Sequence, residues 1–342
     1  MPSYVQDGYG VHAPITPDSI ELVVIINSFN RLVLLREALP SICQALQALT
    51  CRSAIVVFDA GSSDGSVEFV CTTAAQWPSL EILCLCPPAE ADRSFSAGCN
   101  AAVQAAGDRF PNLQYCFFFE TDNLIVNAHA LPLAIQLLEQ QPSLAAVGFT
   151  AERCDGSKVA SGNRFPSLVA FVIGQQMAKR LGLDPFQITH WQPWEGVRWG
   201  LSDVMFTSPL LVRYRVWQAT NGMDAARFPF SDCDNDWCWT VYKQGWKTAV
   251  LDLPGVIHDN RSQASSWSAN RVLDFHRARL RLLQKHRWTP IHWLKPLLLL
   301  RHSLEWLLLS LKTLWTDQAR ASLRHRGLLI KTVLHNYEHL SP

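Results

Sequence analysis

Two carboxylates follow a strongly apolar segment near the middle of the chain. Residues 115–119 read Tyr-Cys-Phe-Phe-Phe, and Glu120 and Asp122 come directly after them. Such an apolar run is typical of a strand that is buried on both faces of a parallel sheet. Ligands of open α/β sheets bind beyond the carboxyl ends of the strands, and hard cations prefer oxygen ligands. We therefore interpret the two acids as a candidate cation site, with a plain polar turn as the alternative.

Polar loops also follow two earlier apolar segments. Asn27 opens the first loop after residues 22–26, and Asp59 opens the second after residues 54–58. The second loop, residues 59–66, is rich in glycine and serine and leads into a helix whose amide end suits an anion. Its glycines lack the GxGxxG spacing of a dinucleotide site, so the sequence gives little support to a Rossmann cofactor.

These segments belong to an alternation of strands and helices. We expect strands over residues 22–26, 54–58, 80–85, 114–119 and 145–150, with helices between them. The alternation predicts a mostly parallel sheet with helices on both faces. Residues 93–100 are expected to form a polar loop before the helix that begins at Ala101. Residues 151–230 are irregular, with a return to the sheet expected over residues 210–212.

Charge is distributed unevenly along the 342 residues, although the net charge is only +1. Residues 271–342 contain 13 lysines and arginines against 4 aspartates and glutamates, and residues 1–270 contain 17 against 25. A basic tail on an acidic body indicates an anionic partner for the tail. Membrane surface, lipid phosphate and nucleic acid all remain candidates at this point.

The cysteines and the apolar segments bear on location. The ten cysteines are scattered without the CxxC spacing of a zinc site, which is typical of reduced thiols in a cytosolic protein. Residues 1–18 lack the basic start and apolar core of a secretory signal. Every stretch of about 20 residues contains a charge, so we expect no transmembrane helix. These features predict a cytoplasmic protein, with the inner face of the membrane left open.

Four blocks, in order, resemble motifs of the family 2 inverting glycosyltransferases of the GT-A fold. Residues 24–31 resemble the opening V-x-x-x-N-Y-N-R, and residues 56–66 resemble V-V-D-N-G-S-S-D-G-S. Residues 118–122 lie where the family carries its D-x-D motif, and residues 230–234 resemble F-x-E-D-x-D. Residues 96–100, Ser-Ala-Gly-Cys-Asn, form a weaker fifth block. The second block is the most specific of these matches.

Three features depart from the family pattern. Glu120 replaces the first acid of the D-x-D motif, which keeps the charge but lengthens its reach. Ser231 stands where the family has an acid before the second aspartate, which leaves that role to Asp232. Residues 151–215 match no motif of the family, so the acceptor stays undetermined.

The resemblance implies an α/β fold of GT-A type, with a mostly parallel central sheet flanked by helices and a C-terminal helical extension. It implies a leader over residues 1–20, a catalytic domain over residues 21–265 and a basic helical extension over residues 266–342. The nucleotide-sugar half of the catalytic domain would span residues 21–150, and the acceptor half residues 151–265.

The resemblance also implies an activity. It is the metal-dependent transfer of a sugar from a nucleotide-diphosphate donor to a saccharide, lipid-linked or polysaccharide acceptor, with inversion. This is a glycosyltransferase of hexosyltransferase type (EC 2.4), acting in polysaccharide biosynthesis and without a nucleic-acid partner. The nucleotide, whether UDP, GDP or dTDP, is not decided by the motifs.

For the metal, the resemblance assigns Mg²⁺ or Mn²⁺ to Asp122, with Glu120 on the ribose or on a metal-bound water. His258 follows the last apolar run, where the family often has a histidine near the diphosphate, and would bind metal or phosphate. A histidine with an ordinary polar role is the equal alternative.

For the donor nucleotide, the resemblance assigns Asn27 and Asn30 to the loop after the first strand, and Asp59 to the base. Arg93 would meet the diphosphate or simply be solvated. Asp64 is expected to be structural, since its side chain can fix the turn through hydrogen bonds to the backbone.

For catalysis, an inverting transfer needs a base that deprotonates the acceptor hydroxyl. The resemblance assigns this role to Asp232, with Asp234 as support. The preference of a helix N-terminus for acids is sufficient to explain Asp234 and Asp236. Asp232 therefore remains the residue of this cluster to which the role of catalytic base is assigned.

Two groups of apolar residues have open roles. Trp191, Trp194 and Trp199 either stack on an acceptor sugar or belong to the core. A set of leucines in the tail is expected on one helical face together with Trp315: Leu294, Leu297, Leu298, Leu304, Leu308 and Leu311. That face would contact a membrane, pack on the catalytic domain or form a homodimer.

Two other classes of protein are weighed against the transferase. A sugar-1-phosphate nucleotidylyltransferase would need a glycine-rich loop with arginine or lysine after the first strand, which residues 27–30 do not supply. A non-catalytic binder of sugar nucleotides or glycans would not need acids at both motifs. We therefore favour the transferase.

Overall fold

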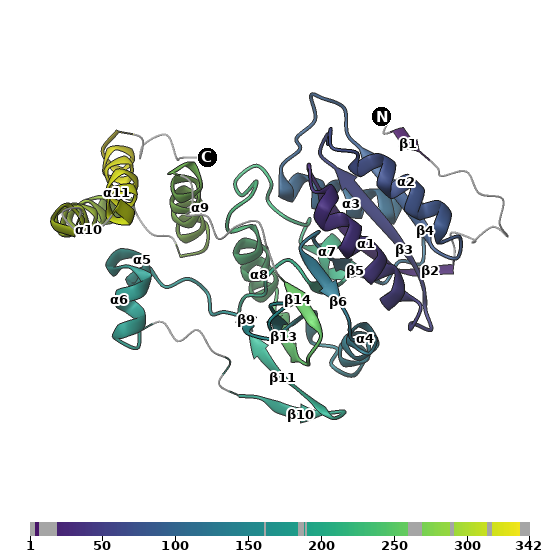
Figure 1. Cartoon of the computed structure of the whole chain (residues 1–342). Coiled ribbons are helices and arrows are strands. Elements are labelled where there is room, and N and C mark those ends of the chain that lie inside the picture. The colour runs from purple at the N-terminus through teal and green to yellow at the C-terminus, as the bar shows by residue number, and fades with distance from the viewer. Residues whose placement is uncertain are drawn as a thin grey trace. The chain divides into compact units, whose positions relative to one another are not determined.

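The computed structural model has two compact units, each of which is described by itself (Figure 1). The first unit comprises Met1–Arg164 and Gln187–Arg261, and the second comprises Phe165–Phe186 and Ser262–Pro342. The structure describes residues 4–6, 19–160, 162–183, 188, 190–258, 269–287, 291–312 and 317–335.

A ten-stranded sheet, in the part of the chain described, forms the centre of the first unit. Its order is β1-β4-β3-β2-β5-β12-β7-β13-β11-β10. The strands are β1 (Tyr4–Gln6), β2 (Ile20–Ser28), β3 (Arg52–Asp59), β4 (Glu81–Cys86), β5 (Tyr115–Phe118), β7 (Leu144–Phe149), β10 (Gln192–Trp194), β11 (Val197–Ser202), β12 (Leu210–Arg213) and β13 (Lys247–Asp252). Strands β4, β3, β2 and β5 pair in parallel, whereas β1, β11 and β12 run against the others.

Helices pack on both faces of this sheet because successive side chains of its strands point to opposite sides. Leu22, Val24 and Ile26 of β2 belong to the same buried cluster as residues of α1, α2 and α4. Phe58 of β3 faces the other way, toward Gly98 in α3. The helices are α1 (Leu32–Leu46), α2 (Ser66–Gln76), α3 (Phe95–Arg109), α4 (Ala130–Gln140), α7 (Tyr214–Ala219) and α8 (Cys233–Lys243). The expected α/β architecture, a mostly parallel central sheet with helices on both faces, is confirmed.

One local expectation is wrong and another is confirmed. The polar loop expected over residues 93–100 is wrong, because α3 begins at Phe95, where the Ser94 side chain accepts a hydrogen bond from the amide of Ala97. The small and polar residues of this turn hide the helix in the sequence. The return to the sheet expected over residues 210–212 is confirmed, since β12 lies at the centre of the sheet, antiparallel to both β5 and β7.

A second, smaller sheet has the order β6-β14-β8-β9. Its strands are β6 (Asn123–Ile125), β14 (Val256–His258), β8 (Ala151–Glu152) and β9 (Lys158–Ala160). The antiparallel pairing of β14 with β6 sets His258 opposite Asn123. This sheet therefore brings β14, which lies near the end of the first unit, next to the residues that follow β5.

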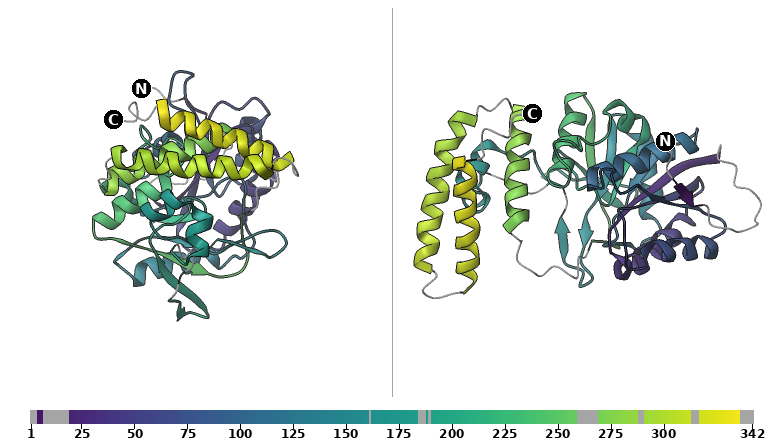
Figure 2. Two further views of the ribbon diagram at one scale, coloured as in Figure 1. Left: turned by 90° about the vertical axis from the view of Figure 1, so that its left-hand side faces the viewer. Right: turned by 90° about the horizontal axis from the view of Figure 1, so that it is seen from above.

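The second unit is entirely helical in its described residues. It contains α5 (Leu168–Ile173), α6 (Gln175–Arg180), α9 (Ala269–Arg287), α10 (Ile291–Lys312) and α11 (Asp317–His335). Figure 2 shows α10 and α11 side by side. None of the helices described is long and apolar enough to cross a membrane.

This unit differs from the predicted extension in one respect. Residues 165–186, which we expected in the acceptor half of the catalytic domain, cluster with the C-terminal helices. The reason is apolar packing, since Leu168 and Phe171 of α5 pack against a buried cluster that contains Leu294 and Leu298. Trp315 lies outside the described residues, as does most of the expected leader.

Candidate active site

The loops after β2 and β3 meet at the carboxyl edge of the sheet. Ser28 and Asp59 are paired in the parallel register of the two strands. Asn30 has a left-handed backbone with φ 52°, and its Oδ1 accepts a hydrogen bond from the amide of Ser63 at 2.9 Å. The Asn30 amide donates in turn to Ser62 Oγ at 2.8 Å. Asn30 therefore fastens the first loop to the second.

Asp59 closes β3 and is buried. Its Oδ1 accepts hydrogen bonds from the amides of Gly61 at 3.0 Å and Ser62 at 2.6 Å, as in an Asx turn. Its Oδ2 is buried and accepts no hydrogen bond from the residues that the structure describes. A buried acceptor left without a donor is costly, so this oxygen is suited to a ligand that carries an N–H or O–H group.

Arg93 packs over the same loop. Its guanidinium donates to the carbonyl oxygens of Ala60 at 3.4 Å and Pro87 at 3.1 Å. Gly61 has φ +96°, and a Cβ there would lie 2.4 Å from Arg93 Nη1. The close approach requires glycine, and the alternative that Arg93 is simply solvated is wrong.

Asn27 connects the end of β2 to α3. Its Nδ2 donates to the carbonyl of Phe95 and to Cys99 Sγ, both at 3.1 Å. A Cβ on Gly98 would lie 2.4 Å from Asn27 Oδ1 and 2.8 Å from the ring of Phe58, so only glycine allows this packing. Asn27 therefore holds the first turn of α3 against the sheet.

The acids after β5 are held by residues that are far away in the sequence. The amide of Glu120 donates to Ser208 Oγ at 2.6 Å. Asn123, which is fully buried, donates from Nδ2 to the same Ser208 Oγ and, at 3.2 Å, to the carbonyl of Glu120. Ser208 thus holds the backbone of Glu120 and the side chain of Asn123, on either side of Asp122.

These hydrogen bonds also orient His258. Because Asn123 Nδ2 is a donor to two partners, its Oδ1 faces His258 Nδ1 at 2.8 Å as an acceptor. The network therefore assigns the proton of a neutral imidazole to Nδ1 and leaves Nε2 with a lone pair. His258 Nδ1 also lies 3.7 Å from Asp122 Oδ1. Asn123 thus holds Nδ1, and Nε2 is the ring nitrogen that remains able to bind a cation.

The side chain of Asp122 is mostly buried, with 10% of its surface exposed. Its Oδ1 is buried and accepts no hydrogen bond from the described part of the chain. An orphaned carboxylate oxygen beside an oriented histidine fits a divalent cation. Within the described residues, however, no three histidine, cysteine or acidic side chains converge as a ready-made metal cage. Mg²⁺ is commonly held by one or two carboxylates together with substrate phosphates, so the pair fits that mode of binding.

Glu120 reports on the electrostatics of the site. Desolvation of its carboxyl group, and then the charge of Asp122, raise the pKa of Glu120 to about 8. Arg31 opposes this rise, and the charge of Asp234 adds to it. The second acidic motif therefore lies within electrostatic reach of the first. The structure brings the two motifs to the same end of the sheet.

The second motif begins helix α8. Asp232 is its N-cap residue, has φ 60° and is 5% exposed. Asn235 Nδ2 donates to Asp232 Oδ1 at 3.2 Å and to Asp234 Oδ1 at 3.0 Å. A left-handed backbone is uncommon for a residue other than glycine, and such conformations cluster at functional sites. The Asn235 amide thus orients both carboxylates.

The weak fifth block of the sequence positions this motif. Ser96 Oγ donates a hydrogen bond to the carbonyl oxygen of Phe228 at 2.5 Å, and the Ser96 amide donates one to the carbonyl oxygen of Pro229 at 3.0 Å. Asn100 and the backbone of Met223 exchange two hydrogen bonds of 2.7 and 2.9 Å. The start of α3 therefore braces the chain that leads into the second acidic motif.

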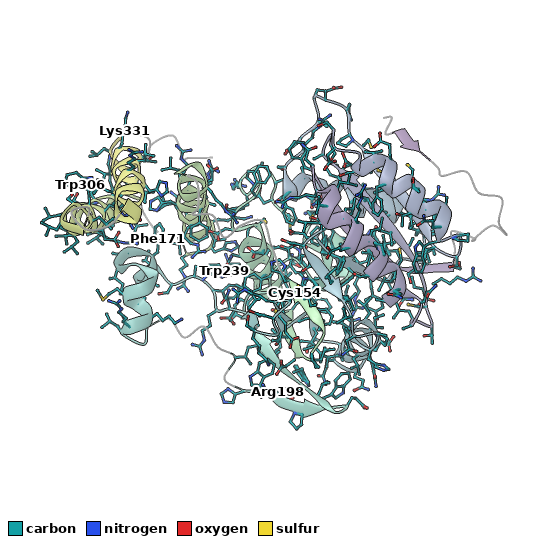
Figure 3. The ribbon with its side chains drawn as sticks, viewed as in Figure 1. Cys154, Phe171, Arg198, Trp239, Trp306 and Lys331 are labelled. Carbon is teal, nitrogen blue, oxygen red and sulfur yellow. The ribbon has the colours of Figure 1, made fainter. Side chains whose placement is uncertain are left out.

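The three tryptophans have different surroundings. Trp199 is buried in the main core, and Trp194 packs against that core and donates to Gln140 Oε1 at 2.8 Å. The ring of Trp191 lies 4.9 Å from the guanidinium of Arg198, which is labelled in Figure 3. Trp199 is thus a core residue, and the expectation of sugar stacking is wrong for it.

Sequence reasoning missed Asn123 and Ser208. Asn123 directly follows the acidic motif, and its position was the one available signal. Ser208 lies 85 residues from its partner Asn123, in a stretch that matched no motif, so the sequence carried no signal for it.

A family model described as "Glycosyltransferase like family 2" matches residues 17–278. No curated protein sequence matches the chain. The structure of S. aureus TarS 1-349 in complex with UDP-GlcNAc is similar in fold, with a TM-score of 0.50, 11% identity, and coverage of 82% of this chain and 71% of that chain. The mannosyltransferase PcManGT from Pyrobaculum calidifontis, in complex with GDP-Man and Mn²⁺, has a TM-score of 0.49, 13% identity, and coverage of 98% and 91%.

Proposed function

The chain belongs to glycosyltransferase-like family 2, and on this premise we propose that it is a metal-dependent, inverting glycosyltransferase of hexosyltransferase type. The donor would be a sugar linked to a nucleoside diphosphate. The acceptor would be a saccharide, a lipid-linked sugar or a polysaccharide. One observation carries this proposal: the first turn of α3 is hydrogen-bonded both to Asn27 at the end of β2 and to the residues that precede Asp232, which supports a shared site for the two acidic motifs.

Asp122 and His258 are the proposed holders of Mg²⁺ or Mn²⁺. The orphaned Oδ1 of Asp122 and the oriented ring of His258 support this assignment. The ion, when bound, would act as a Lewis acid that stabilises the charge developing on the departing diphosphate. Glu120 lies beside this pair and is assigned to the ribose or to a water on the ion.

Asn27, Asn30, Asp59 and Arg93 are the proposed donor-binding residues. The unsatisfied Oδ2 of Asp59 is a hydrogen-bond acceptor suited to an N–H of the nucleotide base. Asn30 holds the loop that carries this acid. Arg93 reinforces the same loop from outside, and its cationic group would attract the diphosphate.

Asp232 is the proposed general base. An inverting transfer requires a carboxylate that removes the proton of the acceptor hydroxyl as this oxygen attacks the anomeric carbon. The shared hydrogen bonds from Asn235 hold Asp232 and Asp234 in fixed orientations. Asp234 would keep a negative charge next to the base and so support it electrostatically.

The test begins with donor binding. UDP-, GDP- and dTDP-sugars are screened by thermal shift with and without Mn²⁺, because a true donor stabilises the folded chain by mass action. We expect one nucleotide class to raise the melting temperature, and Asp122→Ala to abolish the contribution of Mn²⁺ without unfolding the chain. Stabilisation without hydrolysis or transfer would indicate a non-catalytic binder. Unchanged metal dependence in Asp122→Ala would contradict the metal assignment.

The place of action is proposed from the acceptor class. Lipid-linked sugars and growing polysaccharides are assembled at membranes, and a nucleotide sugar is a cytoplasmic substrate. We therefore place the enzyme in the cytoplasm, at the inner face of a membrane.

A further inference from the structure

Helix α10 carries an apolar stripe that faces solvent. Seven large side chains, each at least 48% exposed, form it: Trp293, Leu297, Leu300, Leu304, Leu307, Leu308 and Leu311. With 3.6 residues per turn, these positions fall within a sector about 100° wide. From Trp293 to Leu311 the stripe is about 27 Å long at 1.5 Å per residue. It contains only tryptophan and leucine.

The stripe is separate from the face that folds the helical unit. Leu294 and Leu298 are buried and pack in one cluster with Leu280 of α9 and Val333 of α11. His302, on the same side of α10, is also buried. The single apolar face expected from the sequence is therefore wrong. The leucines divide between two faces, because Leu294 and Leu298 pack in the core of the helical unit whereas the leucines of the stripe are exposed.

A monomeric soluble protein rarely exposes a continuous apolar patch of this size. α10 is not a membrane-spanning helix either, since Lys295, Arg301 and Glu305 interrupt its apolar sequence and none of the described helices can cross a bilayer. A helix that lies on a membrane surface would cover its apolar stripe with lipid and would not have to cross the bilayer. Such helices bury an apolar face at the boundary between lipid head groups and acyl chains.

The charge of the surrounding unit selects the partner. Residues 271–342 hold 13 lysines and arginines against 4 acids. Two copies of such a surface would repel each other, whereas anionic lipid head groups attract it. Arg324 and Lys331 are exposed cations on α11, the helix packed along α10. Figure 3 shows Lys331 on this helix.

Tryptophan at the stripe fits the same partner. Trp293 begins the stripe and is 69% exposed, and Trp306, labelled in Figure 3, is 42% exposed on another side of the helix. Indole rings favour the membrane interface because they combine an apolar body with one polar N–H group.

We propose that the α10 stripe docks the protein on an anionic bilayer. The helix would lie parallel to the surface, with its stripe among the upper acyl chains and the cations of α11 at the lipid phosphates. The docking itself is independent of catalysis. Only its purpose, which is to deliver the enzyme to a membrane-bound acceptor, rests on the proposed function.

The test is flotation of the full chain with vesicles of phosphatidylcholine, with and without phosphatidylglycerol. We expect flotation with the anionic vesicles and little with the neutral ones. Leu304→Glu, at the centre of the stripe, should reduce the bound fraction at least tenfold. Leu201→Glu is the matched control, because it places the same charge on an exposed leucine of the catalytic unit. It should bind like the wild type.

Circular dichroism and transfer to a water-soluble acceptor accompany these measurements. Both should be unchanged in Leu304→Glu, so that lost flotation is separated from misfolding and from loss of catalysis. Equal flotation of Leu304→Glu and wild type would overturn the proposal. A second result would also overturn it: the wild-type chain floats with neither kind of vesicle and sediments as a dimer, and Leu304→Glu sediments as a monomer. A second copy of the chain would then cover the stripe.

Discussion

The two units of the molecule bury polar side chains for different purposes. In the catalytic unit, buried oxygens of Asp59 and Asp122 face no donor among the described residues. In the helical unit, the half-buried carboxylate of Glu305 forms ion pairs with Arg326 at 2.7 Å and with Arg301 at 3.1 Å. A charge compensated inside the fold contributes to the scaffold. An acceptor left open at the end of a strand is suited to a ligand.

Both arrangements affect the free energy of folding. Leaving a buried acceptor without a donor destabilises the folded state by about 1–3 kcal/mol, unless a ligand satisfies it. Breaking a fully buried ion pair costs about 3–5 kcal/mol, because an unpaired charge remains, and the half-buried network of Glu305 should cost less than this. Substitutions at the strand ends should therefore impair turnover and spare folding. Substitutions in the helical network should impair folding and spare turnover.

The largest effect is expected from Asp232→Asn. Asparagine preserves the size of the side chain and its contact with Asn235, but it cannot accept a proton. General-base catalysis contributes about 10²- to 10⁴-fold, so turnover should fall about a thousandfold with little change in donor affinity. Steady-state transfer kinetics measure both quantities. Asp155→Asn, in an exposed turn of the same unit, is the control and should keep full activity. A loss of less than tenfold in Asp232→Asn would remove this acid from the catalytic step.

The second largest effect is expected from acid on the helical unit. Burial, and then the charge of His302, lower the pKa of His276 to about 3, with Arg301, Arg326 and Arg277 acting in the same direction. The unfolded chain binds a proton at this imidazole below about pH 6.5, whereas the folded chain stays neutral down to about pH 3. Folding stability should therefore be intact above pH 6.5. It should fall by about 1.4 kcal/mol per pH unit below that value.

Urea unfolding of wild type and His276→Gln at pH 7.5 and pH 4.5 measures this effect, with circular dichroism as the signal. Glutamine does not titrate, so the stability of the variant should depend less on pH, by about 3 kcal/mol over the interval. Glu305 does not interfere, because its pKa is lowered to about 2 and its contribution is lost only below pH 4.5. Equal pH dependence in the two proteins would show that His276 is not held neutral by the fold.

A smaller effect is expected from Asn123→Ala. The substitution removes the acceptor that orients His258 and the donor to Ser208, so the histidine can rotate and change tautomer. Residues that orient a metal ligand typically contribute about 10- to 100-fold to metal affinity or activity. The Mn²⁺ concentration for half-maximal activity should rise by that factor.

The combination with His258→Ala separates positioning from general destabilisation. If Asn123 acts through His258, the double variant should be no worse than His258→Ala alone, because coupled residues are not additive. Fully additive losses would mean that Asn123 acts elsewhere in the site.

Much of the fold could be predicted from the sequence. The parallel strands β2, β3 and β5 are continuous apolar runs followed by polar loops, and their parallel direction follows from the alternation with helices. Helix α3 was placed too late, because its first turn uses Ser96 and Gly98 to approach the sheet rather than an apolar stripe. Its signal lies in packing, which a periodic pattern does not record.

The site was predictable only where its residues are local. Glu120 and Asp122 follow one strand, and Asp232 starts one helix, so each motif is visible in the sequence. The bridge from Ser208 to Asn123 spans 85 residues and depends on β12 inserting beside β5. The roles of Trp199 and of the α10 leucines depend on which face each residue turns inward. The order of hydrophobic residues alone does not determine this.

The smallest effect is expected from Asp64→Ala. This variant tests whether an acid of the first unit whose oxygens already accept hydrogen bonds belongs to the scaffold or to the binding site. Asp64 lies in the same loop as Asp59 but is exposed, and both of its oxygens already have donors. Oδ2 accepts from the amide of Leu32 at 2.9 Å, and Oδ1 accepts from Ser66 Oγ at 2.6 Å. These bonds resemble a helix cap, whose loss costs about 1 kcal/mol. We expect the free energy of unfolding to fall by that amount, and turnover and donor affinity to change less than threefold. An acid whose two oxygens already accept hydrogen bonds thus belongs to the scaffold, even in the loop that contains Asp59. A large rise in the donor KM would instead place Asp64 in the binding site.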